Sequence, residues 1–600
     1  MNDTVLGKDV QLFGWVQIKR EHGGVVFIDL RDRSGIVQLV FNENFNPRVF
    51  RQAAELKSEY VVKVAGEVRK RENPNPEIPT GYFEVWAKEI TVLNASKPLP
   101  IAVVKQSGVS EDLRLKYRYI DLRREEMRNN ILMRHRVTSA IRKYLDESGF
   151  IDIETPFLTK STPEGARDFI VPSRMNRGKF YALPQSPQIF KQLIMVSGFE
   201  KYYQIVRCFR DEDLRADRQP EFTQVDIEAS FIDEEDVYTL VDGMFKKLLG
   251  ECYGIDLPTP VKRFEYDRVM EEYGTDRPDL RFGLRIANLH SLAGFQPKEF
   301  VRDGLAKGKQ LFGIFVPFPD KVARKALEGF AERAKKEGVD AFSWLKGPSG
   351  AEHVGEPSGE PSGANTQGMS GPLVKLFELD ISDAVKELNK SEGESSSTGS
   401  QGSFLLCAAF GKKTSVLQFL GKIRLELGAA LGLIDRKRQE FCWVVDFPLF
   451  EWSDEEQKIT SVHHPFTSPR PEDLDLLEKD PFKVKSRSYD FVLNGIELGG
   501  GSIRIHESGT QDRIFSILGL TKEETTEKFG FLLDALQYGA PPHGGIAFGL
   551  DRIMMMLQAA DSIRDVISFP KTSSGACLLS GAPDRVSPKQ LGELGLNLID

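Results

Sequence analysis

Cysteine is scarce in this sequence, and the five that occur (Cys208, Cys252, Cys407, Cys442 and Cys577) are widely scattered with no Cys-x-x-Cys pair. This scarcity excludes a disulfide framework and a cysteine zinc site, and it predicts a reducing compartment, the cytoplasm. No run of about 18 apolar residues occurs and the first residues are polar, so we expect no membrane span and no signal peptide. The net charge of −8 argues against a broadly basic nucleic-acid coat, although a local basic patch is enough to bind RNA.

Six hundred residues exceed what one hydrophobic core can organise, so the sequence predicts several domains. We expect an N-terminal β-rich domain at residues 1–98 and a linker at 99–130. A larger domain follows in two parts, 131–284 and 426–600, and an inserted α+β domain at 285–425 separates them. Within the inserted domain, residues 347–371 and 390–403 have low-complexity Gly- and Ser-rich composition. Such composition buries too little apolar surface to offset its ordering entropy, so it predicts mobile loops.

The N-terminal domain has the pattern of a small barrel. Five segments rich in β-branched and aromatic residues are separated by turn signals, and one helical segment precedes the fourth; the strands are expected at 10–16, 25–30, 35–41, 60–68 and 82–93, and the helix at 47–57. This order indicates an OB fold, which often binds oligonucleotides through aromatic side chains on one face. Phe27 and Gln38 are candidate base contacts, with core or surface filling as the alternative for each.

A charged loop between two apolar strands is the most informative stretch of the chain. Apolar residues fill 202–209 and 222–231, and the second run alternates with Gln224, Asp226 and Glu228, which predicts an antiparallel hairpin. The loop from Arg210 to Gln219 holds three arginines and four acids. Because guanidinium groups match phosphate and carboxylate oxygens in pairs, we interpret this loop as a site for an anionic ligand. A solvated hairpin tip is the alternative.

Two carboxylates near the C-terminal end of the chain are candidate metal ligands. Asp490 and Glu497 lie on strands that flank an expected turn at residues 494–495, and three consecutive glycines follow at 499–501. Mg²⁺ often takes one or two carboxylates together with substrate oxygens, although spacing alone also fits an exposed hairpin. His463 has a histidine neighbour but no third zinc ligand nearby, so an imidazole that contacts a charged substrate is the better interpretation.

Together these pieces resemble a known family. A long helix followed by a strand ending at Pro156, the sequence Phe-Arg-Asp-Glu at 209–212, and Gly-Leu-Asp-Arg at 549–552 opening a helix are similar to the three signatures of class II aminoacyl-tRNA synthetases. The segments 162–169, 188–191, 463–467 and 495–502 resemble the bacterial-type aspartyl-tRNA synthetases most. The resemblance covers essentially the whole chain, including the N-terminal barrel and the bacterial-type insertion.

The resemblance implies an α+β fold: a six- or seven-stranded antiparallel sheet with flanking helices, an OB-fold barrel and an inserted α+β domain, assembled as a homodimer. It also implies a reaction in which L-aspartate attacks the α-phosphate of ATP, with Mg²⁺, to give aspartyl-adenylate and pyrophosphate. The 3′-terminal adenosine of tRNA-Asp then takes the aspartyl group.

Residue roles follow from the same resemblance. The catalytic residues are Arg210, which holds the α-phosphate and the substrate α-carboxylate, and Arg552, which holds the outer phosphates. The aspartate contacts are Glu164, Gln188, Lys191, Arg210, Asp226, His463 and Arg504. The ATP contacts are Arg210, Asp211, Glu212, Gln219, Phe222, Glu497, Gly549, Leu550, Asp551 and Arg552. Asp490 and Glu497 hold Mg²⁺, and Phe27, Gln38 and Glu84 contact the anticodon.

His22 bears on the choice of tRNA. In this family, histidine at that position resembles the enzymes that charge both tRNA-Asp and tRNA-Asn, whereas discriminating enzymes tend to have leucine there. A tRNA-dependent amidotransferase is then expected to convert Asp-tRNA-Asn. One alternative is a strict tRNA-Asp enzyme. A second is a non-catalytic RNA-binding paralogue, which the arginines and acids at 210, 212, 504 and 552 disfavour. A third is a free asparagine-forming ligase, which would not need the barrel.

Overall fold

The computed structural model of the 600-residue chain describes residues 3–103, 108–161, 166–214, 217–292, 295–317, 322–348, 353–354, 371–380 and 403–598. The chain divides into two compact units: Met1–Leu132 with Ser568–Asp584, and Met133–Ile567 with Arg585–Asp600. Glu164 and most of the two low-complexity segments lie outside the described residues.

The first unit contains the predicted barrel. Its five strands are β1 (Asp9–His22), β2 (Val25–Arg31), β3 (Ile36–Asn42), β4 (Val61–Lys70) and β5 (Phe83–Asn94). They close in the order β1-β2-β3-β5-β4, with β3 and β5 parallel and the other pairs antiparallel. The helix α1 (Pro47–Ala54) begins after Asn46, whose side chain accepts a hydrogen bond from the Val49 N–H. Alternate strand residues such as Val26, Ile28 and Val64 are fully buried inside the barrel. The rest of the unit holds η1 (Asp3–Val5), α2 (Glu111–Lys116) and α3 (Arg118–Asp121).

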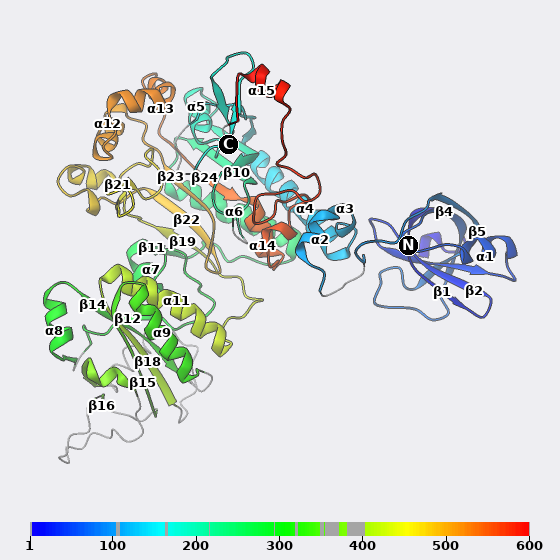
Figure 1. Cartoon of the computed structure of the whole chain (residues 1–600), viewed down its shortest axis with the longest axis horizontal. Coiled ribbons are helices and arrows are strands. Elements are labelled where there is room, and N and C mark those ends of the chain that lie inside the picture. Colours follow the sequence, from blue (N-terminus) through cyan, green and yellow to red (C-terminus); the bar gives the residue numbers. More distant parts are fainter. Residues whose placement is uncertain are drawn as a thin grey trace. The chain divides into compact units, whose positions relative to one another are not determined.

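The second unit is built on an eight-stranded sheet, in the order β11-β19-β22-β23-β24-β10-β9-β6 (Figure 1). In that order the strands span Arg263–Glu265, Phe441–Val445, Ser488–Leu493, Ile496–Ile503, His543–Gly549, Glu221–Ser230, Lys201–Phe209 and Ile151–Asp152. The predicted hairpin is confirmed: β9 and β10 pair antiparallel. The expected antiparallel sheet is confirmed by its six central strands, from β19 to β9, which all pair antiparallel; the short edge strands β6 and β11 extend it to eight and join in parallel pairs. These strands have two and three residues, which is too short to show a period of two.

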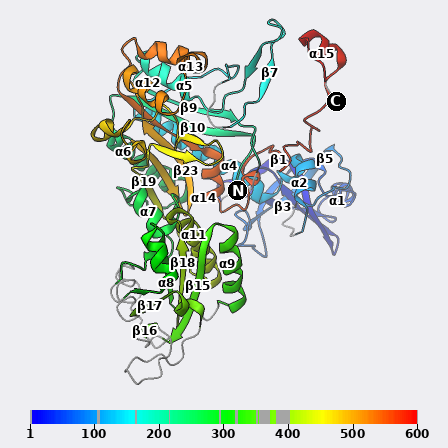
Figure 2. The same ribbon diagram turned by 60° about the vertical axis from the view of Figure 1, so that its left-hand side comes forward.

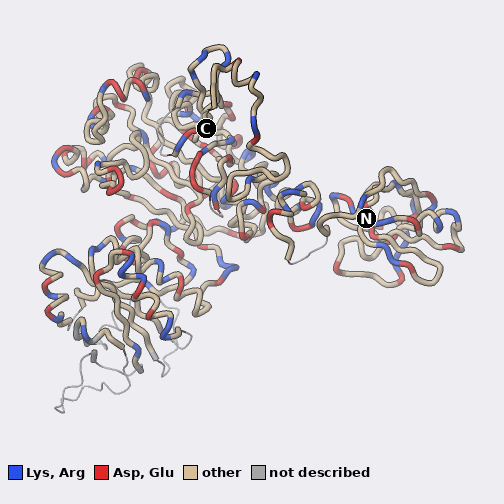
Figure 3. The backbone as a smooth tube through the Cα atoms, in the orientation of Figure 1, with Lys and Arg blue, Asp and Glu red and all other residues tan. Residues whose placement is uncertain are grey.

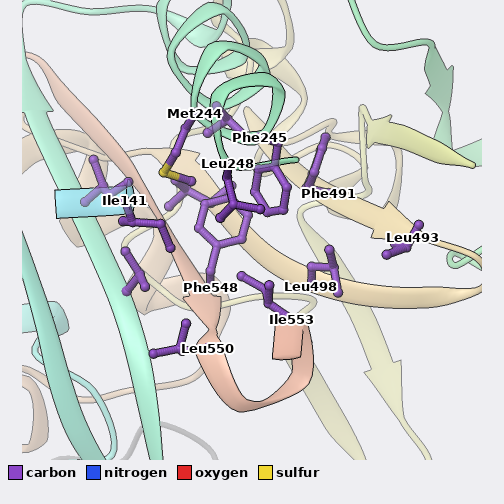
Figure 4. Close-up of a cluster of buried hydrophobic side chains, with 14 of the residues drawn as sticks. Ile141, Met244, Phe245, Leu248, Phe491, Leu493, Leu498, Phe548, Leu550 and Ile553 are labelled. Atoms are coloured by element: carbon purple, nitrogen blue, oxygen red, sulfur yellow. The ribbon is translucent and has the colours of Figure 1, made fainter. Parts of the chain in front are cut away.

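Helices α4 (Glu125–Glu147), α6 (Glu234–Tyr253) and α14 (Leu550–Leu557) supply side chains to the core of this sheet. Figure 4 shows Phe245 and Leu248 of α6 meeting Phe491, Leu498 and Phe548 from the strands. Each of these five side chains is at most 1% exposed. Truncating a buried phenylalanine to alanine typically costs about 3–5 kcal/mol. The core therefore fixes the strands whose opposite face carries the polar residues described below.

A smaller sheet lies within residues 285–425. Its order is β12-β14-β18-β15, with bounds Ile286–Asn288, Gln310–Pro317, Ser403–Gly411 and Val339–Pro348. Helices α9 (Arg324–Lys336) and α11 (Lys413–Leu431) pack against it (Figures 1 and 2) and complete a hydrophobic core of its own. Next to it are α8 (Glu299–Ala306), η3 (Pro372–Lys375) and a sheet of β13 (Gln296–Pro297), β17 (Phe377–Asp380) and β16 (His353–Val354). The exact domain boundaries stay a prediction.

The second unit contains further elements outside these sheets. They are β7 (Ile170–Pro172), β8 (Phe180–Ala182), α5 (Gln188–Val196), α7 (Tyr266–Tyr273), β20 (Phe450–Ser453), β21 (Lys458–Ser461), η4 (Pro471–Leu476), η5 (Pro481–Lys483), α12 (Ser508–Ile517), α13 (Lys522–Leu536), η6 (Ile563–Asp565) and α15 (Pro588–Leu594). Basic and acidic residues are interspersed along both units (Figure 3). Among the helices in the described part of the chain, none has the length and apolar character that crossing a membrane requires.

Candidate functional site

A cavity of about 660 Å³ opens on the second unit and gathers most of the predicted site residues. It is lined by fourteen of them: Gln188, Lys191, Arg210, Glu212, Gln219, Phe222, Asp226, His463, Asp490, Glu497, Arg504, Gly549, Asp551 and Arg552. These residues come from segments more than 350 positions apart, which the central strands bring together. Of the described residues predicted for the site, Asp211 and Leu550 do not line the cavity; Leu550 packs in the core.

Strand β10 carries a row of polar side chains, of which Gln224 and Asp226 line the cavity. Because side chains alternate along a strand, Gln224, Asp226 and Glu228 share one face. The Glu228 carboxylate reaches over the neighbouring strand β24, where a Cβ on Gly545 would lie 2.1 Å from Glu228 Oε2. Glycine at that position is therefore required for the carboxylate to occupy its place.

Two fully buried cations lie beside these acids. Arg504 donates from Nε and Nη2 to the two oxygens of Glu228, at 2.9 and 3.1 Å. Lys191 Nζ donates to Asp226 Oδ1 at 3.0 Å and lies 3.4 Å from Glu228 Oε2. Burial alone raises the pKa of Glu228, but Arg504 and Lys191 outweigh it and hold that pKa below its usual value. Burial raises the pKa of Asp226, whose Oδ2 is buried with no hydrogen-bond partner among the described residues.

The two adjacent histidines face different groups. His464 Nε2 lies 2.6 Å from Arg504 Nη1, and burial followed by the charge of Arg504 lowers the pKa of His464 well below its usual value. His464 is therefore held as a neutral imidazole beside the arginine. His463 Nε2 lies 3.4 Å from Asp490 Oδ1. Burial lowers the pKa of His463, but Asp490 and Glu497 outweigh burial and raise that pKa above its usual value.

Asp490 and Glu497 form a close carboxylate pair on β22 and β23. Asp490 pairs with Gly500 across the strands, and a Cβ on Gly500 would lie 2.4 Å from Asp490 Oδ1 and 3.6 Å from Glu497 Oε1. The charge of Asp490, and then burial, raises the pKa of Glu497. Asp490 Oδ1 accepts no hydrogen bond from any described residue. Two crowded hard oxygen ligands fit a divalent cation such as Mg²⁺, although no cluster of three His, Cys, Asp or Glu ligands occurs among the described residues.

The loop between β9 and β10 brings Arg210 over the ring of Phe222, with the guanidinium carbon 5.1 Å from the ring centroid. Arg210 Nε is buried and donates to no described residue. Nearby, Glu212 forms an ion pair with Arg218 at 2.6 Å, and the Gln219 amide donates to the Arg218 carbonyl at 3.3 Å. The loop thus presents one cation, supported by an aromatic ring, whose donor is left for a ligand.

Other predicted residues are engaged within the protein. Asp551 accepts from the Thr223 N–H at 2.7 Å and from Arg134 Nη1 at 2.5 Å, so it ties α14 to β10 and α4. Arg552 Nη1 donates to the Glu497 carbonyl at 2.8 Å. Asp211 Oδ2 lies 3.9 Å from Arg167 Nε, outside the cavity.

Sequence reasoning missed several residues that line or support the cavity. Glu228 lies in the same alternating row as Asp226, so the period of two could have identified it. His464 is adjacent to a predicted histidine, but only the structure shows which of the two faces Arg504. Arg218 belongs to the charged loop, whereas Arg277 follows α7 and has no local signal.

In the barrel, the predicted anticodon contacts form a polar network. Gln38 Nε2 donates to Glu84 Oε2 at 2.9 Å, and Trp86 Nε1 donates to Glu84 Oε1 at 2.8 Å. Gln38 Oε1 accepts from Arg71 Nη2 at 3.0 Å. Phe27 on β2 is partly buried, and the exposed His22 ends β1 at the turn into β2.

Comparison with known proteins agrees with this architecture. Residues 110–573 match the family described as tRNA synthetases class II (D, K and N), and residues 10–93 match the OB-fold nucleic acid binding domain. The chain is 48% identical over 595 residues to the aspartate–tRNA(Asp/Asn) ligase of Caldanaerobacter subterraneus subsp. tengcongensis, which covers 99% of this chain and 96% of the relative. It is 47% identical over 601 residues to the aspartate–tRNA ligase of Macrococcus caseolyticus, which covers 100% of this chain and 97% of the relative.

Solved structures share the fold at lower identity. The asparaginyl-tRNA synthetase of Pyrococcus horikoshii, with asparaginyl-adenylate, superimposes with a TM-score of 0.56 at 19% identity and covers 98% of this chain and 97% of its own. This likeness concerns the fold alone, whereas the full-length identities near 48% concern the family. The chain therefore belongs to the class II aminoacyl-tRNA synthetases, in the family of the aspartate–tRNA ligases.

Proposed function

We propose that this protein attaches L-aspartate to tRNA in two steps, with ATP as the energy source. An oxygen of the aspartate α-carboxylate attacks the α-phosphorus, the bond to the bridging oxygen breaks, and its electron pair leaves with pyrophosphate. The 3′-terminal adenosine of tRNA then attacks the aspartyl carbonyl and releases AMP. The observation that carries this proposal is the buried Arg504, held by Glu228 and flanked by Lys191 and the neutral His464.

Fixed positive charge at this end of the cavity suits the side-chain carboxylate of aspartate. Arg504 and Lys191 supply the donors, and His464 keeps Arg504 Nη1 oriented without adding charge. Asparagine presents a neutral amide, whose N–H groups cannot accept hydrogen bonds from these donors. A site that loses a required polar partner in this way can discriminate by about 10⁴–10⁵-fold.

The ammonium group of aspartate fits the carboxylate of Asp226 on β10. Asp226 Oδ2 is buried without a described partner, and an ammonium nitrogen would satisfy it. Gln188 lines the same part of the cavity. Glu164 is retained as a proposed contact from the resemblance, and it lies outside the described residues. The predicted contact by His463 is also retained, although this side chain faces Asp490.

The nucleotide fits the other end of the cavity. Arg210 would hold the α-phosphate, because its Nε is the buried donor without a described acceptor. Phe222 would stack on adenine, with Glu212, Gln219, Gly549 and Arg552 as further contacts. The roles proposed for Asp211, Leu550 and Asp551 are better explained as support: the first lies outside the cavity, and the other two fix α14.

Asp490 and Glu497 would hold Mg²⁺, which when bound supplies charge neutralisation for the phosphates. Glu497 must be deprotonated to serve as a ligand, and its raised pKa implies that Mg²⁺ affinity rises with pH. Because glutamine is a weaker Mg²⁺ ligand than a carboxylate, replacing Glu497 by Gln should raise the Mg²⁺ concentration needed for half-maximal adenylate formation.

Aspartate-dependent ATP–pyrophosphate exchange tests the first step. The intact chain should exchange label with aspartate and not with asparagine at equal concentration. Folded protein that shows no exchange with aspartate would favour a non-catalytic RNA-binding role.

We further propose that both tRNA-Asp and tRNA-Asn are substrates. Histidine at position 22 supports this, as do relatives named aspartate–tRNA(Asp/Asn) ligase, although other relatives are named aspartate–tRNA ligase. Charging each purified tRNA at enzyme levels that saturate tRNA-Asp decides the matter. If tRNA-Asn accepts aspartate, a tRNA-dependent amidotransferase is the expected next enzyme; if it does not, the strict enzyme is the correct assignment.

A homodimer is proposed from exposed apolar side chains of the second unit. Ile151, Phe157, Leu158 and Ile170 are 45–61% exposed around the sheet edge at β6 and the β7–β8 hairpin. Sedimentation equilibrium should give twice the chain mass of 67.5 kDa.

All five cysteines are free thiols, which supports a reducing compartment such as the cytoplasm.

A further inference from the structure

A second cavity of about 570 Å³ adjoins the first within the same unit. Its walls come from α7, the segment 274–279, α11 and the turn between β22 and β23. Six residues line both cavities and mark their junction: Asp217, Tyr266, Asp276, Arg277, Glu497 and Arg552. The proposed Mg²⁺ ligand Glu497 and the proposed phosphate contact Arg552 therefore lie where the two cavities meet.

The segment that carries Arg277 is held tightly between neighbouring elements. Gly274 ends α7 with a φ of +69°, and a Cβ there would lie 2.1 Å from the Leu417 carbonyl oxygen on α11. On the other side, a Cβ on Gly495 in the β22–β23 turn would lie 3.3 Å from Asp279 Cβ. Arg424 of α11 donates to the Asp279 carbonyl at 2.9 Å. The backbone at Arg277 is therefore fixed relative to the strands that carry Asp490 and Glu497.

Arg277 is the least committed cation at this junction. Its Nε donates to Asp276 Oδ1 at 3.3 Å, and its side chain is 49% exposed. By contrast, the other arginine of the junction, Arg552, donates from Nη1 to the Glu497 carbonyl at 2.8 Å. The terminal nitrogens of Arg277 donate to no described residue, so its guanidinium can bind an oxyanion without first breaking a short ion pair. Its charge also acts on Glu497, since Arg277 is one of the groups that lower the pKa of that carboxyl.

We propose that Arg277 binds the outer phosphates of ATP and then the leaving pyrophosphate, at the junction that opens into the second cavity. This inference rests on the proposed function, and it adds a residue that neither the sequence motifs nor the resemblance assigns. When the bond to the α-phosphorus breaks, the bridging oxygen gains negative charge and pyrophosphate becomes a more highly charged anion than the phosphates of ATP. A guanidinium fork at the junction neutralises that charge away from the aspartate end of the site.

Kinetics of ATP–pyrophosphate exchange on the full-length chain test the proposal. Arg277→Ala should raise the KM for pyrophosphate and for ATP by about tenfold, as expected for a hydrogen bond between charged groups, and leave the KM for aspartate within about twofold. Arg277→Lys should recover part of the loss, because it keeps the charge without the fork. Arg268→Ala is the matched control: it removes the same charge from α7, where Arg268 pairs with Glu272 at 2.8 Å and lines neither cavity.

Calorimetric titration of the protein with magnesium pyrophosphate gives a second measurement that needs no turnover. Arg277→Ala should weaken this binding by the same factor, and the control should not. Equal affinity in Arg277→Ala and Arg268→Ala, or an equal rise in all three KM values, overturns the proposal. If the wild-type chain shows no exchange with aspartate yet binds pyrophosphate through Arg277, the proposed function fails while the phosphate site stands.

Discussion

The Glu84 carboxylate of the barrel and the Asp226 carboxylate of the cavity are both buried, but their hydrogen bonding differs. In the barrel, Glu84 receives a hydrogen bond on each carboxylate oxygen, from Gln38 and from Trp86. In the cavity, Asp226 bonds Lys191 with one oxygen and keeps the other buried without a partner among the described residues. Arg210 Nε in the cavity is likewise buried without a partner among the described residues.

This difference indicates two modes of recognition. Buried polar atoms are nearly always paired in folded proteins, so those left unpaired in one cavity indicate a ligand that completes them. Side chains that are already paired with each other, like those of Gln38 and Glu84, bind a base by exchanging partners or by using their remaining donors. We therefore expect changes in the cavity to abolish chemistry, and changes in the barrel to alter the choice and affinity of tRNA.

The largest effect is expected on stability. Glu228→Ala leaves Arg504 and Lys191 buried without their shared acid, and breaking a buried pair typically costs about 3–5 kcal/mol. Urea unfolding followed by circular dichroism measures the loss. The barrel offers the control Arg20→Ala, which removes an exposed ion pair with Asp29 and should cost at most about 1 kcal/mol. Equal costs for the two variants would remove the distinction between the regions.

Removing the phosphate-binding cation is expected to act on chemistry alone. Arg210→Ala should reduce the rate of aspartate-dependent exchange by about 10²–10³-fold, because one preorganised donor to developing charge contributes that much. The variant should keep the melting temperature of the parent to within a few degrees. Near-normal exchange in this variant would show that the charged loop does not hold the nucleotide.

A barrel substitution should have the opposite profile. Gln38→Ala removes a donor to Glu84 and an acceptor for Arg71, and it should raise the KM for tRNA by about 5–150-fold, which corresponds to about 1–3 kcal/mol. Exchange without tRNA should not change. If exchange fell together with tRNA charging, the barrel and the cavity would not be separate recognition sites.

The smallest effect concerns pH. His464 has its pKa lowered in the folded state, so below about pH 6.5 the unfolded chain takes up a proton that the folded chain does not, and stability falls as pH falls. His463 has the opposite sign: its raised pKa contributes stability at low pH that is lost as pH rises through its folded pKa. His464→Gln should therefore reduce the acid-side slope of unfolding free energy, by at most about 1.4 kcal/mol per pH unit. An unchanged slope would mean that His464 is not held neutral.

Much of both regions follows from local pattern. Strand periodicity and turn residues predicted the five barrel strands, and the apolar runs around the charged loop predicted the β9–β10 hairpin. The spacing of Asp490 and Glu497 around a Gly-containing turn also predicted their placement on paired strands. In each case the relevant contacts lie within a few tens of residues, where the periods of helix and strand and the turn chemistry decide the structure.

The tertiary structure alone decided the rest. Arg504 and Glu228 are 276 residues apart, and they meet because β24 lies between β10 and β23 in the sheet order. Tertiary contacts likewise place His464 rather than His463 beside the arginine, and Arg277 at the junction of the cavities. Local propensity carries no information about which distant strands become neighbours, because burial of the whole core selects that order. The sequence therefore determined the strands and the motifs, and the packed sheet determined which charges share a site.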